Sequence, residues 1–462
     1  MITTMSDSPS SVAKKNKSQK PPFNPPPDAP LSPFSTYEQP TLVNRPSHST
    51  PTRVNASPFT LSSYLLEEIL GCANSDTHST PLYQNKVADF LKAPLELESL
   101  LFYGFCICLD SFVFVLACLP IRLIILSVQF VCKRGCPPKR FSLSDKQLYD
   151  LLRAFIILVC TAGLCTLDYS HLYHFIRSQN AFKLYVIYNL LEVLERLCCS
   201  FGRDFDELYP LCCKLKRTSN PNFFLRQFKR LSFFPNYLVI VCYTFVHSLL
   251  LYIKVISLNV TVNAYNHSLL TLMVSNNFVE LKGNVFKNFK IENIFQITCA
   301  DIVERFQNIV FLGIVCLNNL QDISWELTPD LLSSMLQTVF LVTISEVIVD
   351  SIKHAFILKF NQTTSLIYKQ FGKKIANELL DIERVYPDSS TRAVKVIGFL
   401  PYPLTCVVFR IFIGTLTSSV YSTVTIVSIT WAVSMLFKLL FSLIVTKLGA
   451  SKLKQSLEKE PK

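Results

Sequence analysis

The chain has 462 residues, of which 50% are hydrophobic and only 17% are charged, and its mean hydropathy is +0.33. This composition excludes an ordinary soluble protein and indicates a polytopic membrane protein. The 45 Lys and Arg residues outnumber the 33 Asp and Glu residues, and the net charge of +12 suits basic loops beside anionic cytoplasmic lipids. No RNP-like or zinc-finger pattern accompanies the charge, so membrane lipids are the expected partners and nucleic acid is not.

The first 58 residues are predicted to form a disordered, Pro-rich tail. They hold 12 of the 25 prolines, together with many Ser, Thr and Lys residues. Such a composition buries too little apolar surface to offset the entropy lost on ordering. The tail also lacks the apolar core of a secretory signal peptide. The membrane domain is expected over residues 59–446, and residues 447–462 form a charged C-terminal tail.

Apolar runs within the membrane domain predict helices that cross or enter a membrane. The first run contains Pro120, so it is either one kinked span or a hairpin, because proline removes a helical hydrogen bond. The run at 309–320 is short, which suits a re-entrant or interfacial piece better than a crossing. The expected fold class is all-α, a polytopic transmembrane helical bundle with amphipathic or re-entrant helices. In chain order the candidate segments are residues 103–131, 148–167, 237–262, 309–320, 331–352, 403–419 and 421–445.

The positive charges of the first loops conflict with a simple topology. The stretches at 133–146 and 169–232 are both basic, yet a single full span at 148–168 would place them on opposite sides of the membrane. One of the first two apolar segments is therefore suspected not to cross. The same rule favours cytosolic N- and C-termini. Three glycosylation sequons, at Asn259, Asn266 and Asn361, are too short as motifs to decide the matter.

The stretch from Leu331 to Phe360 is predicted to be one long helix, because it contains no Gly or Pro. Two acidic and two basic side chains recur along it at helical spacing and share one face. A carboxylate in hydrocarbon is costly, so this face should turn toward other helices, a cavity or the membrane interface. The alternatives are a solvated helix end and an ion or substrate path. The candidate residues are Glu346, Asp350, Lys353 and His354, with Arg410 as a possible partner from another segment.

Two further groups of polar residues are candidates for interactions. A helical ion-pair network is expected within 168–196, and an interfacial or partner-docking segment within 275–289, where basic groups alternate with aromatic ones. For the second group, an amphipathic loop helix packed on the bundle remains an equal alternative. The network residues are Asp168, Arg177, Glu192, Glu195 and Arg196, and the segment residues are Asn276, Asn277, Glu280 and Lys282.

No motif for catalysis or cofactor binding is found. Nucleophile elbows, P-loops, GxGxxG, HExxH and paired CxxC motifs are all missing, so neither an enzyme nor a cofactor is expected. His171 and His174 lie near several cysteines, but they lack the ligand spacing of a zinc site, so no metal is expected. Eleven of the 16 cysteines lie between Cys106 and Cys213, mostly in apolar runs, and are expected to be free thiols.

Several stretches in the same order resemble the transmembrane anterior posterior transformation family, also called the cytomegalovirus gH-receptor family. The resemblance covers roughly residues 59–448, and its departures, such as Arg203 where the family tends to carry Gln, are local. The stretches are DYSHLYHFIRSQNAFKLYVIYNLLEVLERLCCSFGRD at 168–204, VISLNVTVNAYNHSLLTLMVSNNFVELKGNVFKNF at 255–289, DIVERFQNIVFLGIVCLNNL at 301–320, SEVIVDSIKHAFILKFN at 345–361 and GFLPYPL at 398–404.

The resemblance implies a non-enzymatic, multi-pass protein of the endoplasmic reticulum membrane. Fungal relatives are associated with a SUN-like partner and with the folding of luminal proteins, and animal relatives with the ciliary basal body and skeletal patterning. The first hypothesis is accordingly a scaffold or quality-control factor. The alternative, from a different class, is a channel, lipid scramblase or transporter that uses the acidic face at Glu346 and Asp350.

Overall fold

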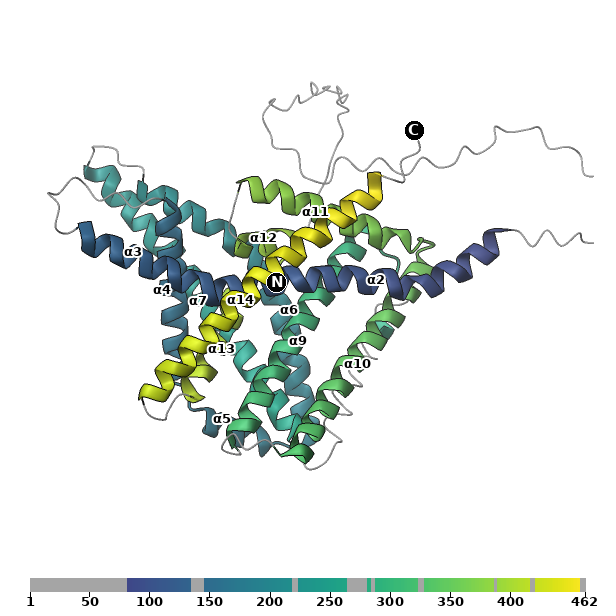
Figure 1. The fold of residues 1–462 in the computed structure, drawn as a ribbon, viewed down its shortest axis with the longest axis horizontal. Helices are drawn as coiled ribbons and strands as arrows, with labels where there is room; N and C mark the ends of the chain where they lie inside the picture. Colours follow the sequence, from purple (N-terminus) through teal and green to yellow (C-terminus); the bar gives the residue numbers. More distant parts are fainter. Residues whose placement is uncertain are drawn as a thin grey trace, which may run out of the picture. The chain divides into compact units, whose positions relative to one another are not determined.

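The computed structural model describes residues 81–133, 145–217, 223–263, 281–283, 287–322, 328–385, 389–415 and 420–457, all within the unit that begins at residue 78. Almost all of these residues lie in helices, and no strand occurs among them (Figure 1). The all-α prediction is confirmed. The tail predicted at 1–58 lies outside the described residues.

Five stretches of the described residues are long and apolar enough to cross a membrane, namely 87–131, 146–165, 235–262, 332–360 and 429–454. The helix ends follow local signals in places: Thr328 precedes α10, whose first residue is Pro329, and the Asp168 side chain accepts the Ser170 N–H at the start of α5. The elements are α2 (Pro81–Val113), the π-helix η1 (Phe114–Cys118), α3 (Leu119–Lys133), α4 (Asp145–Cys165), α5 (Tyr169–Arg177), α6 (Ala181–Arg217), α7 (Phe223–Val262), α9 (Ile291–Asp322), α10 (Pro329–Phe360), α11 (Leu366–Val385), α12 (Ser389–Val396), α13 (Pro401–Thr415) and α14 (Val420–Leu457).

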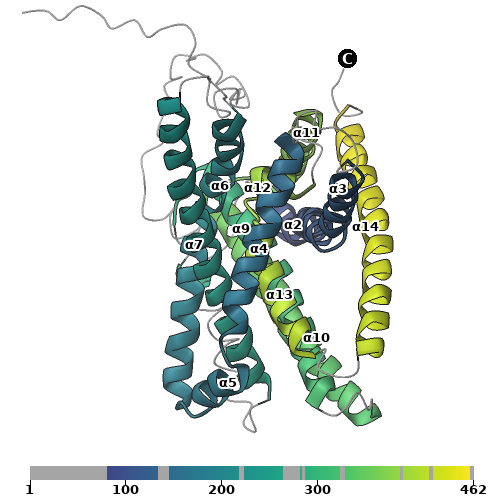
Figure 2. The ribbon, with the colours of Figure 1, turned by 90° about the vertical axis from the view of Figure 1, so that its left-hand side faces the viewer.

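Helices α4, α6 and α7 stand side by side as a column (Figure 2). Tyr237 of α7 donates to the Leu152 carbonyl of α4 at 3.4 Å, and the Cys160 thiol of α4 donates to the Val241 carbonyl at 3.7 Å. These pairs advance together along both helices, so α4 and α7 run in the same direction. Helix α6 follows the short helix α5 and lies between α4 and α7 in the sequence. It runs in the opposite direction to both.

The directions of these three helices resolve the topology conflict that the two basic stretches of the sequence raised. Helix α4 runs from one end of the bundle to the other, and α6 runs back. The start of α4, the end of α6 and the start of α7 therefore lie at the same end. The part of the stretch at 169–232 that precedes residue 218 is thus not one loop but the short helix α5 and a 37-residue returning helix.

Residues 81–133 form one continuous helical rod, α2–η1–α3, which is here called the crossing rod. It lies across the direction of α4, α6 and α7 in both views (Figures 1 and 2). The hairpin considered at Pro120 does not form. The reason lies in η1, where the Leu119 N–H bonds to the Phe114 carbonyl five residues back, so the turn widens just where proline lacks an N–H to donate.

The short segment expected at 309–320 is part of the 32-residue helix α9. The charged residues Asp301 and Arg305 precede this apolar run in the sequence, and in the structure both side chains are paired with other helices and the helix continues through them. The segment is therefore not a separate re-entrant element. Likewise, the two candidates at 403–419 and 421–445 fall in α13 and α14, which the structure separates between Thr415 and Val420.

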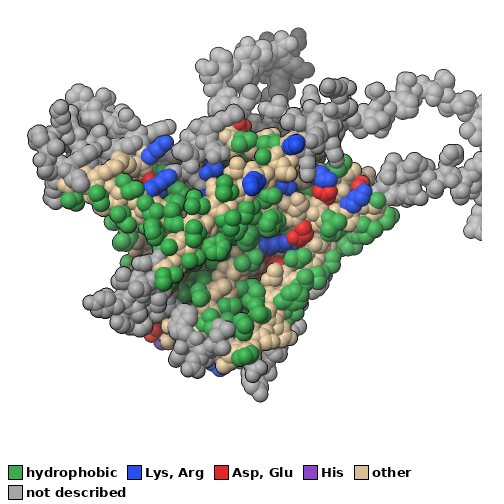
Figure 3. Space-filling view, viewed as in Figure 1, with side chains coloured by type: hydrophobic (Ala, Val, Ile, Leu, Met, Phe, Trp, Pro, Cys, Tyr) green, Lys and Arg blue, Asp and Glu red, His purple; other side chains and the backbone are tan. Residues whose placement is uncertain are grey.

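Helices α10 and α14 are the least enclosed of the long apolar helices. Only 11% of the most apolar window of each is buried, against 50% for α7. Figure 3 shows hydrophobic side chains spread over the face that these helices and α2 form. Their exposed large apolar residues are Leu332, Leu336, Phe340, Leu341, Ile344, Ile348 and Phe360 in α10, and Ile429, Trp431, Val433, Leu436, Phe437, Leu439, Leu440 and Leu443 in α14.

The crossing rod depends on a close approach to α9, which gives a first prediction. A Cβ atom added to Gly104 would lie 2.4 Å from Cδ1 of the buried Ile302. Gly104→Ala should therefore destabilise the protein by about 1 to 3 kcal/mol through overpacking. The measurement is the midpoint of thermal unfolding in detergent, followed by fluorescence-detected size exclusion.

The matched control is Gly313→Ala in α9, where an added Cβ would meet nothing within 4 Å. That variant should be neutral or gain up to about 1 kcal/mol, because alanine favours a helix over glycine. Equal behaviour of the two variants would show that the rod and α9 are not in contact at Gly104.

Candidate functional site

The predicted charged face of α10 lies against α9, α2 and α11. Its side chains join those of three neighbouring helices in what is here called the charge cluster. The members are Glu98 of α2, Asp301 and Arg305 of α9, Asp350, Lys353 and His354 of α10, and Tyr368 of α11.

Asp301 stands at the centre of the charge cluster and is buried. Lys353 Nζ donates to its Oδ1 at 2.8 Å, and His354 Nε2 lies 2.7 Å from its Oδ2. On the other side of the ring, His354 Nδ1 lies 2.8 Å from the Tyr368 hydroxyl. A neutral imidazole with its proton on Nε2 satisfies both contacts, since the carboxylate can only accept and the hydroxyl can donate.

The second half of the charge cluster runs from Asp350 to the crossing rod. Asp350 faces Lys353 at 2.9 Å through Oδ1, and its Oδ2 accepts from Arg305 Nε at 2.8 Å. The two terminal nitrogens of Arg305 face the two carboxylate oxygens of Glu98, each at 2.9 Å. This two-point pairing fixes the guanidinium in orientation as well as in position. The charge cluster therefore ties α2, α9 and α10 together.

The environment of Asp301 shows why it stays ionised. Burial by itself would raise the pKa of the carboxyl, but Lys353 and His354 hold the pKa below its ordinary value. The Tyr368 hydroxyl shows the opposite case, because burial and the nearby Asp301 raise its pKa well above the ordinary value. Asp301 is thus a charged acceptor and Tyr368 a neutral donor, which fits a structural network.

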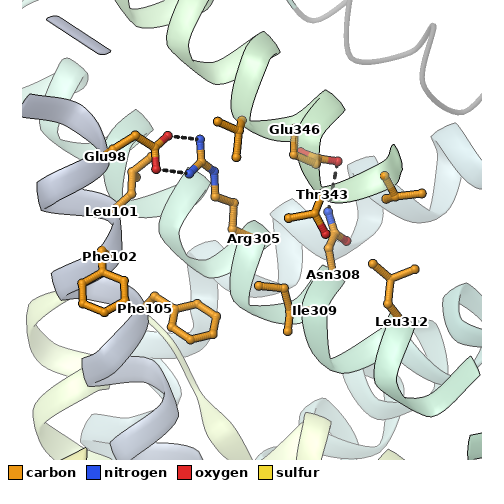
Figure 4. A pocket seen from close by; sticks show the side chains of 12 residues that line it. Glu98, Leu101, Phe102, Phe105, Arg305, Asn308, Ile309, Leu312, Thr343 and Glu346 are labelled. Atoms are coloured by element: carbon orange, nitrogen blue, oxygen red, sulfur yellow. Dashed lines mark hydrogen bonds and ion pairs between the residues drawn. The ribbon is translucent and has the colours of Figure 1, made fainter. Parts of the chain in front are cut away.

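Glu346 lies one turn from Asp350 and has a different setting. Its Oε1 accepts from the Asn308 amide of α9 at 3.2 Å. It borders a cavity of about 270 Å³ between α2, α9 and α10 (Figure 4). Charged and amide side chains stand along one edge of this cavity, and Phe102, Phe105 and Ile309 lie along the rest.

The structure places Arg410 away from the acidic face. Its Nε and one terminal nitrogen donate to the carbonyls of Leu164 and Leu167, at 3.1 and 3.0 Å, around the end of α4. A cation is favoured there, because the last carbonyls of a helix lack N–H partners. Asp301 and Arg305 of α9, rather than Arg410, are the partners of the charged face of α10. Their spacing of four on α9 matches the spacing on α10, which is the only signal that could have pointed to them.

The residues expected to form one network within 168–196 are divided among three places. Asp168 caps α5, and Arg177 lies in the last turn of that helix. Arg196 bridges Glu192 at 2.8 Å and Glu304 of α9 at 3.4 Å. Glu195 is buried and pairs with Lys254 of α7. The five side chains therefore serve several helix contacts.

The expected docking segment is largely outside the described residues, which leave out Asn276, Asn277 and Glu280. Lys282 is exposed within the helical residues 281–283. Elsewhere, the buried Lys438 of α14 pairs with Asp110 of α2, and the buried Arg153 of α4 donates to Thr391 of α12 at 2.9 Å. Among the described residues, no group of three or more His, Cys, Asp or Glu is arranged to hold a metal ion.

The central position of Asp301 gives a second prediction. Asp301→Asn removes the buried counter-charge of Lys353 and weakens the hydrogen bond with His354, which should destabilise the protein by about 3 to 5 kcal/mol. The control is Glu304→Gln on the same helix, because the Glu304 partner Arg196 is 47% exposed and such pairs contribute less than about 1 kcal/mol. Thermal unfolding in detergent compares them, and equal midpoints for the two variants would contradict a structural role of Asp301.

The stabilisation that Asp301 contributes should depend on pH in a definite direction. Because the pKa of Asp301 in the folded protein lies below its ordinary value of 3.8, its stabilisation is present above that pH and is lost as the pH falls below it. The difference in stability between the wild type and Asp301→Asn should accordingly narrow on acidification below pH 3.8.

Comparison with known proteins places these features in a wider context. A family described as a eukaryotic membrane protein family matches residues 143–454. A Dictyostelium discoideum protein named as a TAPT1 homolog is 44% identical over 78% of this chain and 44% of its own length. Transmembrane anterior posterior transformation protein 1 of Mus musculus is 38% identical over 71% of this chain and 57% of its own length.

A Drosophila melanogaster protein, also named as a TAPT1 homolog, is 34% identical over 71% of this chain and 48% of its own length. The chain thus spans about half the length of the curated relatives it matches. No solved structure matches.

Proposed function

The chain belongs to the transmembrane anterior posterior transformation family of eukaryotic membrane proteins, and from that premise we propose that it is a non-enzymatic scaffold of the endoplasmic reticulum membrane. Its task is to hold a second membrane protein, of the SUN-like kind, in support of the folding of luminal proteins. A place at the ciliary basal body and a part in developmental patterning belong to the same proposal. The name of the mouse relative refers to anterior posterior transformation.

One observation supports a holding function above others, and it is the exposed apolar face of α10 and α14. The charge cluster fixes α10 near Asp350, while the half from Leu332 to Ile344 has little cover from the other residues that the structure describes. Lipid tails can cover such a surface, but a partner helix gains closer packing on it. A rigidly anchored helix with an open apolar face is suited to receive a transmembrane helix of another protein.

The channel, scramblase or transporter alternative requires a path lined by the acidic groups. Asp350 faces Arg305 and Lys353, and Asp110 faces Lys438. The cavity beside Glu346 is lined by neither Asp110 nor Arg410. This distribution favours the scaffold as the first proposal.

The distribution of basic residues indicates how the protein is oriented in the membrane. In the sequence, the basic stretches at 133–146 and 214–230 adjoin the start of α4 and the end of α6, and α11 and the C-terminal part of α14 lie toward the same end as these two helix ends (Figure 2). The positive-inside rule favours the cytosol for this end. The opposite end holds α5 and the end of α9, where Asn319 meets Asn263 at 2.8 Å, and it would face the lumen.

A third prediction tests the holding function. A photo-crosslinking amino acid at Phe340 of α10 or Leu440 of α14 should trap one defined membrane protein in cells, because both positions are exposed on the open face. The control is Phe155 of α4, which is 54% exposed on another face. Adducts with lipid alone, or the same adducts from Phe155, would contradict the proposal.

A fourth prediction tests the orientation. An acceptor sequence for N-glycosylation inserted between α9 and α10, after Glu326, should be glycosylated in microsomes, because the end of α9 is assigned to the lumen. The same sequence appended after Lys462 should stay unmodified. Digestion with a glycosidase reads out both, and the reverse pattern would invert the assignment.

A further inference from the structure

The crossing rod is too long for an ordinary membrane span. Its apolar part runs from Val87 to Val131, which is 45 residues, and at about 1.5 Å per residue its length is about 68 Å. The hydrocarbon core of a bilayer is only about 30 Å thick. Such a rod keeps both apolar ends within the core only where its axis is tilted by more than about 60° from the membrane normal, whereas spanning helices are tilted by up to about 40°.

Both ends of the rod expose apolar side chains. These ends are here called the first arm, residues 81–102, and the second arm, which is α3. The side chains between the arms are mostly buried against α9, α12 and α14. On each arm, exposed apolar residues recur every three or four positions and form a stripe, which is typical of a helix that lies at a lipid surface. The stripes consist of Val87, Leu91 and Leu95 on the first arm and Ile124, Val128 and Val131 on the second.

The second arm lies beside the start of α4. Gln147 donates to Gln129 at 3.4 Å, and Arg122 donates to Asp150 at 3.3 Å. Gln147 and Asp150 belong to the first two turns of α4, which begins at Asp145. The second arm is therefore at the end of the bundle where α4 begins.

Helix α10 ends at this same end of the bundle. The Asn318 amide, near the end of α9, donates at 3.3 Å to the hydroxyl of Tyr169, which follows the end of α4. Helix α10 starts at Pro329, soon after α9 ends at Asp322, so it begins where α4 ends. It is long and apolar enough to cross the membrane and thus leads back to the end where α4 begins.

The first arm lies beside the end of α10. The ring centroids of Phe90 and Phe356 are 5.5 Å apart, and Lys369 of α11 pairs with Glu96 at 2.6 Å. Both arms of the rod accordingly contact helix ends at one end of the bundle. A helix that crossed the bilayer would have its two ends on opposite sides.

From these contacts we propose that the crossing rod does not span the bilayer but lies in its plane, embedded in the leaflet at the end where α4 begins, with phospholipid acyl chains packed on the two stripes. Charge supports this partner, because Lys92 is exposed on the first arm and the basic stretch at 133–140 follows the second in the sequence. The first of the two early apolar segments is then the one that does not cross. This placement goes beyond the scaffold function and holds for either orientation of the protein.

The first test uses the full-length protein in sealed microsomes, with one cleavage site for a specific protease inserted before Pro81 and a second inserted between Lys133 and Asp145. Added protease should cut both sites, or neither where the protein has the reverse orientation, and in detergent it should cut both. Cutting of one site alone in sealed microsomes would place the ends of the rod on opposite sides and overturn the proposal. This test replaces no residue of the bundle.

The second test measures the depth of both arms in liposomes. Trp325 and Trp431 are replaced by Phe, and a single tryptophan is introduced by Leu91→Trp or Val128→Trp, at exposed positions of the two stripes. Phospholipids with bromine near the head group should quench both fluorophores more strongly than phospholipids with bromine near the chain end. The ratio of the two quenching efficiencies should be the same for both variants, because an in-plane rod holds its arms at one depth.

The control pair is Phe340→Trp and Phe360→Trp, two exposed positions of α10. Their quenching ratios should differ, because α10 crosses the bilayer and holds them at different depths. Unequal ratios for Leu91→Trp and Val128→Trp would overturn the proposal. Absence of quenching at both would show water or a covering protein on the arms and would overturn it as well.

Discussion

The arrangement of this bundle rests on the need to neutralise a buried carboxylate, that of Asp301. Without a counter-charge such a group in an apolar interior would cost several kcal/mol. Lys353 can supply that charge, and His354 a hydrogen bond, only when α9 and α10 lie in one register. Apolar packing alone tolerates a helix that slides or turns, whereas a pair of ions at 2.8 Å does not. The register of α9 and α10 then positions Arg305 against the crossing rod.

The same constraint recurs at other contacts between helices. Lys254 and Glu195 join α7 to α6, and Lys438 and Asp110 join α14 to the crossing rod. In each case one cation and one anion from different helices meet within an apolar surface. A sparingly charged sequence therefore uses its charges where they distinguish one arrangement of helices from another, and leaves the exposed apolar faces of α10 and α14 free of them.

Helix periodicity was enough to predict the all-α fold and the common face of Glu346, Asp350, Lys353 and His354, because these follow from spacing along one helix. It could not identify Asp301 and Arg305 as partners, since contacts 45 to 53 residues apart in sequence depend on how the helices pack. For a related reason, the sequence placed Glu195 in a helical ion-pair network with Glu192 and Arg196 but could not show that it pairs with Lys254 of α7, 59 residues away. Arg410 was assigned by charge alone, whereas the carbonyls at the end of α4 attract it.

The crossing rod has a consequence for the order in which the protein is assembled. In chain order it is the first apolar helix that the structure describes, yet three of its contacts are with much later parts of the chain. Glu98 pairs with Arg305, 207 residues later, the Ala117 carbonyl accepts from Trp431, 314 residues later, and Asp110 pairs with Lys438, 328 residues later. During synthesis this long apolar helix therefore carries a carboxylate that lacks its partner until α14 has been made. Until then the nascent protein exposes the kind of segment that membrane chaperones retain.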